Sequence, residues 1–344
     1  MINRISFMGK VTSPDFEASA QKARLKPMEN DCFVKSTEPK KEQPDNEFIK
    51  WAGENRFLEG GLQAALSEEN LLGQGFSHSV YKIPNNDDFV LRVSRNYFDS
   101  KRTDYSQYKI TDTEDKKLKG NFGQEVAILE TDSPNDPRIS VLKKQNGISN
   151  GNPPPSAIHY ENGDLREGEL PYEAIERKEH YAKCLQILAD APEEAYDSLI
   201  DKFDALNNAG YRFDYYNANN FLLDEDKGTI EIIDTDKMSD KYDNDLGNAL
   251  WALTNIEYLN TYIMPSYNPD EPKVSDDDKN LAIKNTLTII DKYTKAMQKK
   301  GKKFSQNGYE FTVHLLGSFP MSIFLQTNSR SEKIEKLRNM GLID

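Results

Sequence analysis

The chain has 344 residues, a hydrophobic share of 37% and a net charge of −13. Its length fits one two-lobed domain with an extension, or two modest domains, and the low hydrophobic share predicts polar tails or long loops. So acidic a surface disfavours binding to nucleic acid or anionic lipid, although solubility alone also accounts for the charge.

The chain has two cysteines, Cys32 and Cys184, and neither has a cysteine or histidine at metal-ligand spacing. A disulfide framework or a zinc site is therefore not expected. The first ten residues lack the apolar run of a Sec signal peptide. The longest apolar stretch, 315–325, is too short to span a bilayer. We expect a cytoplasmic protein without a membrane span, and leave open its secretion by a specialised export system.

Residues 1–45 are polar and lack periodicity, so we expect a disordered or loosely attached leader. Apolar residues at helical spacing between Phe48 and Leu66 predict a helix that docks on the domain. The pattern from Asn70 to Val93 predicts a strand, a turn and a second strand. A helical stretch is predicted around Phe122–Leu129.

Two further strands are predicted at 138–142 and 156–160, separated by an exposed loop rich in Asn, Gly and Pro. After Leu170 the chain reads as mostly helical, with a helix over 198–208 that Gly210 is expected to end and one short hairpin over 221–233. The order predicts an α+β chain with a β-rich N-terminal lobe, residues 46–160, and a helical C-terminal lobe, residues 161–344.

The loop that begins Gly73-Gln74-Gly75 is the first feature that suggests nucleotide binding. Glycines there allow a tight turn and a close approach of backbone N–H groups to phosphate. Val80 follows where an apolar side chain could cover an adenine ring. An ordinary hairpin can contain the same glycines, so this loop is not specific by itself.

Arg92 is a cation inside the apolar strand around Val90–Val93. Burying it is costly without an anionic partner, which a nucleotide phosphate or the carboxylate of Glu125 would supply. The alternative is an arginine on an edge strand that points to solvent.

Two acidic segments follow in the C-terminal half. Asp214 comes after a helix and could orient an attacking hydroxyl, and an asparagine a few residues later could bind Mg²⁺ through its oxygen. Asp234 and Asp236 come directly after a short apolar strand and form a second candidate set of Mg²⁺ ligands. Solvated turns also favour Asp and Asn, so each segment alone has an ordinary explanation.

Together, the order and spacing of these segments resemble the protein-kinase-like superfamily over residues 70–253. The resemblance implies a bilobal fold that binds ATP and Mg²⁺. It gives Arg92 the position of the superfamily's phosphate-binding lysine and Glu125 that of its αC glutamate. It gives Asp214 the catalytic position and Asp234 the metal-binding one.

Other positions follow from the same resemblance. The stretch around Glu161, residues 158–165, looks like the hinge that holds adenine through backbone hydrogen bonds. The metal-binding asparagine is either Asn219, which keeps the usual distance from Asp214, or Asn220, which keeps the usual register with the strand after it.

Asp234 and Asp245 are eleven residues apart, much closer than in regulated eukaryotic protein kinases. So short an activation segment resembles aminoglycoside and choline phosphotransferases, and also compact kinase-like effectors that bacteria inject into host cells. Activity that does not depend on phosphorylation of this segment is expected.

The sequence therefore predicts a kinase that transfers the γ-phosphate of ATP to a hydroxyl, on a protein substrate as in effector-type Ser/Thr kinases. A small-molecule kinase of the aminoglycoside/choline phosphotransferase type is the first alternative. A catalytically weak pseudokinase that binds nucleotide or a partner is the second. The acceptor, the oligomeric state and the roles of residues 1–69 and 274–344 stay open.

Overall fold

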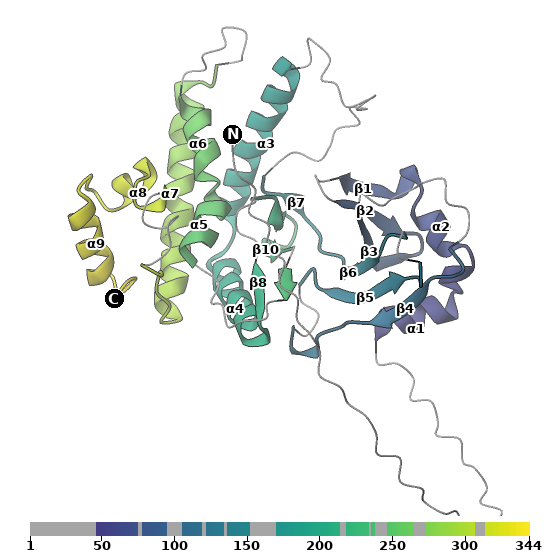
Figure 1. The fold of residues 1–344 in the computed structure, drawn as a ribbon. Helices are drawn as coiled ribbons and strands as arrows, with labels where there is room; N and C mark the ends of the chain where they lie inside the picture. Colours follow the sequence, from purple (N-terminus) through teal and green to yellow (C-terminus); the bar gives the residue numbers. More distant parts are fainter. Residues whose placement is uncertain are drawn as a thin grey trace, which may run out of the picture. The chain divides into compact units, whose positions relative to one another are not determined.

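The computed structural model describes the chain in eleven segments (Figure 1). They are residues 46–74, 78–94, 105–118, 122–133, 136–151, 170–213, 218–233, 235–237, 246–264, 273–306 and 314–344. The predicted leader, residues 1–45, lies outside them.

A six-stranded antiparallel sheet forms the N-terminal part, in the order β1-β2-β3-β6-β5-β4. Its strands are β1 (Leu71–Gln74), β2 (His78–Ile83), β3 (Asn86–Ser94), β4 (Lys109–Asp112), β5 (Glu125–Glu130) and β6 (Ile139–Lys143). The predicted strand, turn and strand over 70–93 are confirmed. Asn85 makes the turn between β2 and β3 with a φ of 61°, a conformation that asparagine tolerates well.

The helix predicted around Phe122–Leu129 is wrong, because this stretch contains β5. The strand pairs with β4 on one side and β6 on the other. Val126 through Leu129 are all buried, so the apolar run carries no helical period. A short, continuous apolar run fits a buried strand as well as a helix, and partners distant in the sequence decide between them.

The helix predicted from Phe48 to Leu66 is divided into α1 (Glu47–Glu54), the 3-10 turn η1 (Phe57–Glu59) and α2 (Gly61–Ala65). The helical conformation is interrupted at Arg56, with a φ of 49°, and at Gly60, with a φ of 140°. The predicted docking is present: Phe48 packs against Phe89 of β3 with ring centroids 5.5 Å apart. Asn46 caps α1 and donates from Nδ2 to the carbonyl oxygen of Val126 at 2.8 Å.

Two small sheets follow. One has the order β10-β9-β7, with β7 (Ile148–Ser149), β9 (Phe221–Asp224) and β10 (Thr229–Ile232). The other pairs β8 (Tyr211–Phe213) with β11 (Thr235–Lys237). The hairpin predicted over 221–233 is therefore confirmed.

The chain leaves β6 at Lys143 and already pairs with β9 at Ile148. Residues 144–151 thus join the large sheet to the three-stranded one, and we call them the crossing segment. The hinge predicted at 158–165 and the strand predicted at 156–160 lie outside the described residues.

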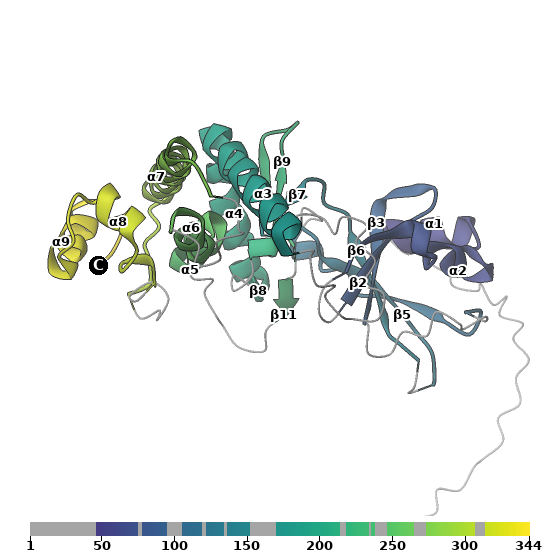
Figure 2. The same cartoon turned by 90° about the horizontal axis from the view of Figure 1, so that it is seen from above.

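The C-terminal part is mostly helical. Its helices are α3 (Leu170–Asp190), α4 (Glu193–Ala209), α5 (Leu246–Thr254), α6 (Ile256–Ile263), α7 (Asp276–Lys299), α8 (Phe319–Phe324) and α9 (Arg330–Asn339). Gly210 ends α4 with a φ of 78°, as the sequence predicts. Helix α7 packs along both α3 and α4 (Figure 2).

Two hydrophobic cores match this division. The first lies between the large sheet and α1 and α2, and the second lies among the helices. Leu118, which ends the 3-10 turn η4 (Lys116–Leu118), belongs to the helical core, as does Phe122 before β5. The predicted α+β fold class, with a β-rich lobe followed by a helical lobe, is confirmed. None of the described helices combines the length and apolarity needed to cross a membrane.

Candidate functional site

Three of the predicted nucleotide-binding residues lie on adjacent strands of the large sheet. Gly73 on β1 pairs with Val80 on β2, and Val80 pairs with Arg92 on β3. A Cβ added to Gly73 would meet no atom within 4 Å, so the fold itself does not require glycine there. Gly75 lies outside the described residues.

Arg92 lies on a central strand, because β3 is paired on both sides, with β2 and with β6. The alternative of an edge-strand arginine is therefore wrong. The side chain is half-buried and its Nε atom is buried. Its cross-strand partner on β6 is Ser140, and such partners face the same side of a sheet.

Glu125 lies at the start of β5 rather than on a helix. Its carboxylate accepts from Ser140 Oγ at 2.5 Å and from Arg138 Nη2 at 3.1 Å. Ser140 therefore connects the Glu125 carboxylate to the position opposite Arg92. A contact between Glu125 and Arg92 themselves stays a prediction.

Residues just before β5 approach the strand that leads to Asp234. The Gly123 N–H donates to the carbonyl oxygen of Ile232 at 3.4 Å. A Cβ on Gly123 would lie 3.2 Å from Ile233 Cγ2, so glycine allows this approach. The next residue, Gln124, is 1% exposed, and neither its amide oxygen nor its nitrogen has a hydrogen-bond partner among the described residues. Such an amide is expected to meet ordered water or a bound polar group.

The two acidic segments adjoin one small sheet. Phe213, which precedes Asp214, is the pairing partner of Thr235, which follows Asp234. Asp236 pairs with Arg212 through the backbone. Asp214 and Asp234 themselves lie outside the described residues, as do Glu161 and Asp245.

Asn219 and Asn220 end the 3-10 turn η5 (Ala218–Asn220) and have different surroundings. The carbonyl oxygen of Asn220 accepts from the N–H of Ile233 at 2.8 Å, and Asn220 is 5% exposed. Asn219 faces the crossing segment: its Oδ1 accepts from Ser149 Oγ at 2.8 Å. A Cβ on Gly151 would lie 2.4 Å from that same oxygen.

The crossing segment is also held from α3, through residues that no sequence motif identifies. His180 Nε2 lies 2.7 Å from the carbonyl oxygen of Ser149, and Cys184 Sγ lies 3.5 Å from it. Their i, i+4 spacing places both on one face of α3, which is the only signal in the sequence. Burial lowers the pKa of His180 and raises the pKa of the Cys184 thiol to about 12. Cys184 is therefore a packed thiol rather than a nucleophile.

Tyr211, the first residue of β8, connects this region to the residues before β5. Burial raises the pKa of its phenol, and Asp115 raises it further through its charge and a side-chain hydrogen bond. The charge of Glu125 acts in the same direction. Both carboxylates thus lie close enough to Tyr211 to disfavour its ionisation.

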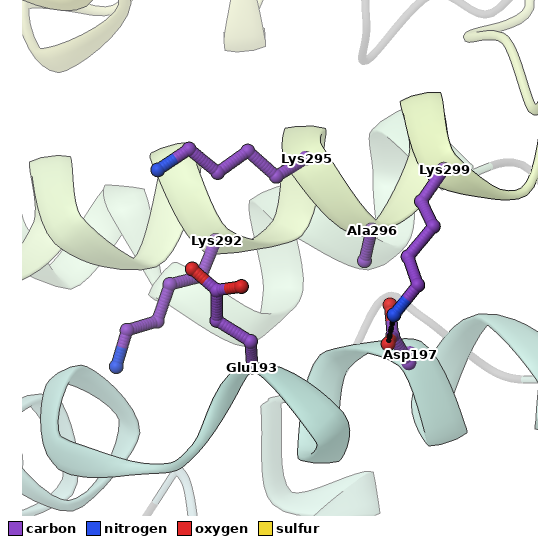
Figure 3. Close-up of a pocket in the computed structure, with 6 residues that line it drawn as sticks. All are labelled: Glu193, Asp197, Lys292, Lys295, Ala296 and Lys299. Carbon is purple, nitrogen blue, oxygen red and sulfur yellow. Dashed lines mark hydrogen bonds and ion pairs between the residues drawn. The ribbon is translucent and has the colours of Figure 1, made fainter.

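A small pocket of about 30 Å³ lies between α4 and α7, and none of the site residues described above lines it (Figure 3). That volume suits one or two water molecules and is far too small for a nucleotide. Lys299 of α7 forms an ion pair with Asp197 of α4 at its edge. Across the described part of the chain, no group of three or more His, Cys, Asp or Glu side chains could hold a metal ion.

The comparisons with known proteins are sparse. No protein-family model matches the chain, and no curated protein matches it. Among solved structures it is similar to the pseudokinase domain of BIR2, an immune regulator of the RLK/Pelle family. The two are 14% identical over 82% of this chain and 83% of that one, with a TM-score of 0.29. A TM-score this low establishes no shared site.

Proposed function

We propose that the chain binds ATP·Mg²⁺ and transfers the γ-phosphoryl group to a hydroxyl. The observation that carries the proposal is a pair of backbone contacts around β8, β11 and η5. Phe213 pairs with Thr235, and Asn220 accepts a hydrogen bond from Ile233. These contacts bring together the chain that flanks Asp214, Asp234 and the asparagine pair, whose oxygen atoms are of the kind that Mg²⁺ prefers.

Of the two asparagines, Asn220 is the better candidate for the metal. Its backbone is bonded to the residue before Asp234. The side-chain oxygen of Asn219 is already engaged by Ser149 and lies against Gly151. We assign metal binding to Asn220 with Asp234, and assign Asn219 to the support of the turn. The bound Mg²⁺ would neutralise charge on the phosphates.

The remaining roles fall to residues on both sides of the site. Arg92, on the same sheet face as Ser140, would neutralise the α and β phosphates. Asp214 would orient the acceptor hydroxyl and accept its proton. The crossing segment, as the link between the two sheets, is a candidate for the hinge beside adenine, next to the prediction at Glu161.

Replacement of the proposed base tests the chemistry. We expect Asp214→Ala to lower kcat about 10²- to 10⁴-fold, because transfer loses its general base. The measurement is release or transfer of label from γ-labelled ATP by the full chain. Thermal melting of both proteins controls for folding. Full turnover by the variant would contradict the role of Asp214.

A second candidate function is nucleotide binding without transfer. It is favoured by Glu125, which lies on a strand and bonds to Arg138 and Ser140. The presence of Arg92 rather than lysine also favours it, because the two cations differ in geometry. Under this alternative, ATP·Mg²⁺ raises the melting temperature, but no γ-phosphate is transferred and no autophosphorylation occurs.

The acceptor is proposed to be a protein, as for an effector-type kinase, with a small hydroxylated molecule as the alternative. Incubation with γ-labelled ATP and a cell lysate, followed by separation of proteins from small molecules, distinguishes the two. Label in the protein fraction alone supports a protein kinase. Label in the small-molecule fraction alone supports the other type of enzyme.

A further inference from the structure

A chain of hydrogen bonds leads from α3 to the asparagine turn. His180 Nε2 lies 2.7 Å from the carbonyl oxygen of Ser149. Because a carbonyl oxygen only accepts, the imidazole N–H is the donor. The hydroxyl of the same serine donates to Asn219 Oδ1 at 2.8 Å. Ser149 thus joins a helix side chain to the turn that contains Asn220.

The position of β7 explains why this donor is needed. This strand is at the end of the order β10-β9-β7, so one of its edges has no neighbouring strand within the described part of that sheet. A half-buried carbonyl oxygen there would be destabilising without a donor. His180 supplies the donor from α3. Cys184, one turn later and 3.5 Å away, offers only a weak thiol.

The neighbours of Ser149 hold the same segment from other directions. The Asn150 N–H donates to the carbonyl oxygen of Phe221 at 2.9 Å, and Asn150 Nδ2 donates to that of Leu253 at 2.7 Å. Gly151 lies so close to Asn219 that a Cβ would meet its Oδ1 at 2.4 Å and its backbone N at 2.8 Å. Asn219 is therefore confined between Ser149 and Gly151.

We infer that His180 is a positioning residue which, through Ser149, fixes Asn219 and so sets the turn that presents Asn220. This inference rests on the proposed function, because that proposal assigns Mg²⁺ binding to Asn220. It goes further by assigning a role to a helix residue that touches neither metal nor nucleotide. The role needs an N–H donor at this position, and it does not need a positive charge.

The test compares full-length variants by hydrogen exchange and by metal dependence. His180→Ala removes the donor, while His180→Gln retains an N–H that can reach the same carbonyl. Glu179→Ala is the matched control, because Glu179 is the exposed neighbour on the same helix. Exchange is followed in peptides that cover 147–151 and 218–223. Binding of ATP is measured over a series of Mg²⁺ concentrations.

We expect His180→Ala to speed exchange in both peptides about three- to tenfold, which corresponds to the net stabilisation that one hydrogen bond provides. The Mg²⁺ concentration for half-maximal ATP binding should rise by a similar factor. His180→Gln should restore both readouts, and Glu179→Ala should change neither. Ser149→Ala, which keeps the carbonyl that faces His180 but removes the bond to Asn219 and the longer one from the Gly151 N–H, should raise the Mg²⁺ requirement even if His180→Ala folds poorly.

Two results would overturn the inference. One is unchanged exchange in His180→Ala, whatever the protein binds. The other is an unchanged Mg²⁺ requirement in both His180→Ala and Ser149→Ala while the wild-type chain binds ATP·Mg²⁺ normally. A wild-type chain that binds no ATP·Mg²⁺ at all would instead refute the proposed function, so the two failures are distinguishable.

Discussion

The absence of one carbon atom at Gly151 determines how closely the crossing segment approaches Asn219. A Cβ there would lie 2.4 Å from Asn219 Oδ1 and 2.8 Å from its backbone N. A flexible side-chain end can move away, but a backbone atom cannot move without displacing the turn. The close approach of Asn219 therefore requires glycine at position 151. The backbone conformation does not, because Gly151 has no positive φ.

We predict that Gly151→Ala destabilises the protein by about 1–3 kcal/mol, as overpacking commonly does. It should also weaken ATP·Mg²⁺ binding, because the shifted backbone belongs to the asparagine turn. The matched control is Gly53→Ala, in α1, where a Cβ meets nothing within 4 Å and alanine favours the helix. Chemical denaturation measures the stability of both variants, and titration with ATP·Mg²⁺ measures their binding. Equal stabilities of the two variants would contradict the account.

His180 gives stability a pH dependence with a definite sign. Burial lowers its pKa from the ordinary 6.5; the hydrogen bond to the Ser149 carbonyl opposes this in part, and the charge of Lys183 adds a smaller lowering. Because the lowered pKa disfavours the charged ring in the folded protein, His180 contributes stability that is fully present above pH 6.5 and is lost as the pH falls through the folded-state pKa. Cys184, the other titratable contact, stays protonated throughout.

We therefore predict that His180→Gln flattens the loss of stability on acidification. Denaturation midpoints of wild type and variant are compared from pH 7.5 to 5, so that the other titrating groups cancel. The free energy of unfolding of wild type should fall relative to that of the variant as pH decreases. Parallel curves would show that His180 keeps its ordinary pKa.

At the scale of elements, the sequence predicts those whose pattern is local. The hairpin over 221–233 and the end of α4 at Gly210 are readable from turn residues and periodicity. Strand β5 is not, because its uniformly buried run becomes a strand through pairing with β4 and β6. The division of the first predicted helix depends on the left-handed Arg56, which no propensity favours.

The role of helices α8 and α9 is seen only in the folded structure, because the sequence left the role of residues 274–344 open. Their buried residues Met321 and Leu337 belong to the same core as those of α4 and α7. The last residues are tied back as well, since the Phe304 N–H donates to the carbonyl oxygen of Leu342 at 2.7 Å. The C-terminal region is thus part of the helical core.

Leu337→Ala should accordingly lower the free energy of unfolding by about 2–5 kcal/mol, the usual cost of a cavity at a buried leucine. Leu337 is 0% exposed. On the opposite side of α9, Glu335 is exposed, and Glu335→Ala should stay within about 0.5 kcal/mol of wild type. Denaturant titration of both variants measures these free energies of unfolding. A small effect at Leu337 would mean that α9 contributes little to the core.

At the scale of the whole molecule, the order of a sheet followed by helices was predictable from composition and periodicity. The candidate site was predictable only in part. Arg92, the pair Asn219 and Asn220, and the segments around Asp214 and Asp234 were predicted from their order and spacing, whereas the preference for Asn220 comes from its bond to Ile233. Gly123, Ser149 and His180 do not, because their roles come from contacts with residues that lie 31 to 109 positions away.

Calorimetric titration of ATP into the full chain, with and without Mg²⁺, tests for the proposed Mg²⁺-dependent nucleotide site at Asn220. We predict that wild type binds ATP more tightly with Mg²⁺ than without. Asn220→Ala should lose at least about tenfold of that Mg²⁺ effect, as loss of a ligand requires. Absence of ATP binding by wild type, or an Asn220→Ala variant with the full Mg²⁺ effect, would contradict the account.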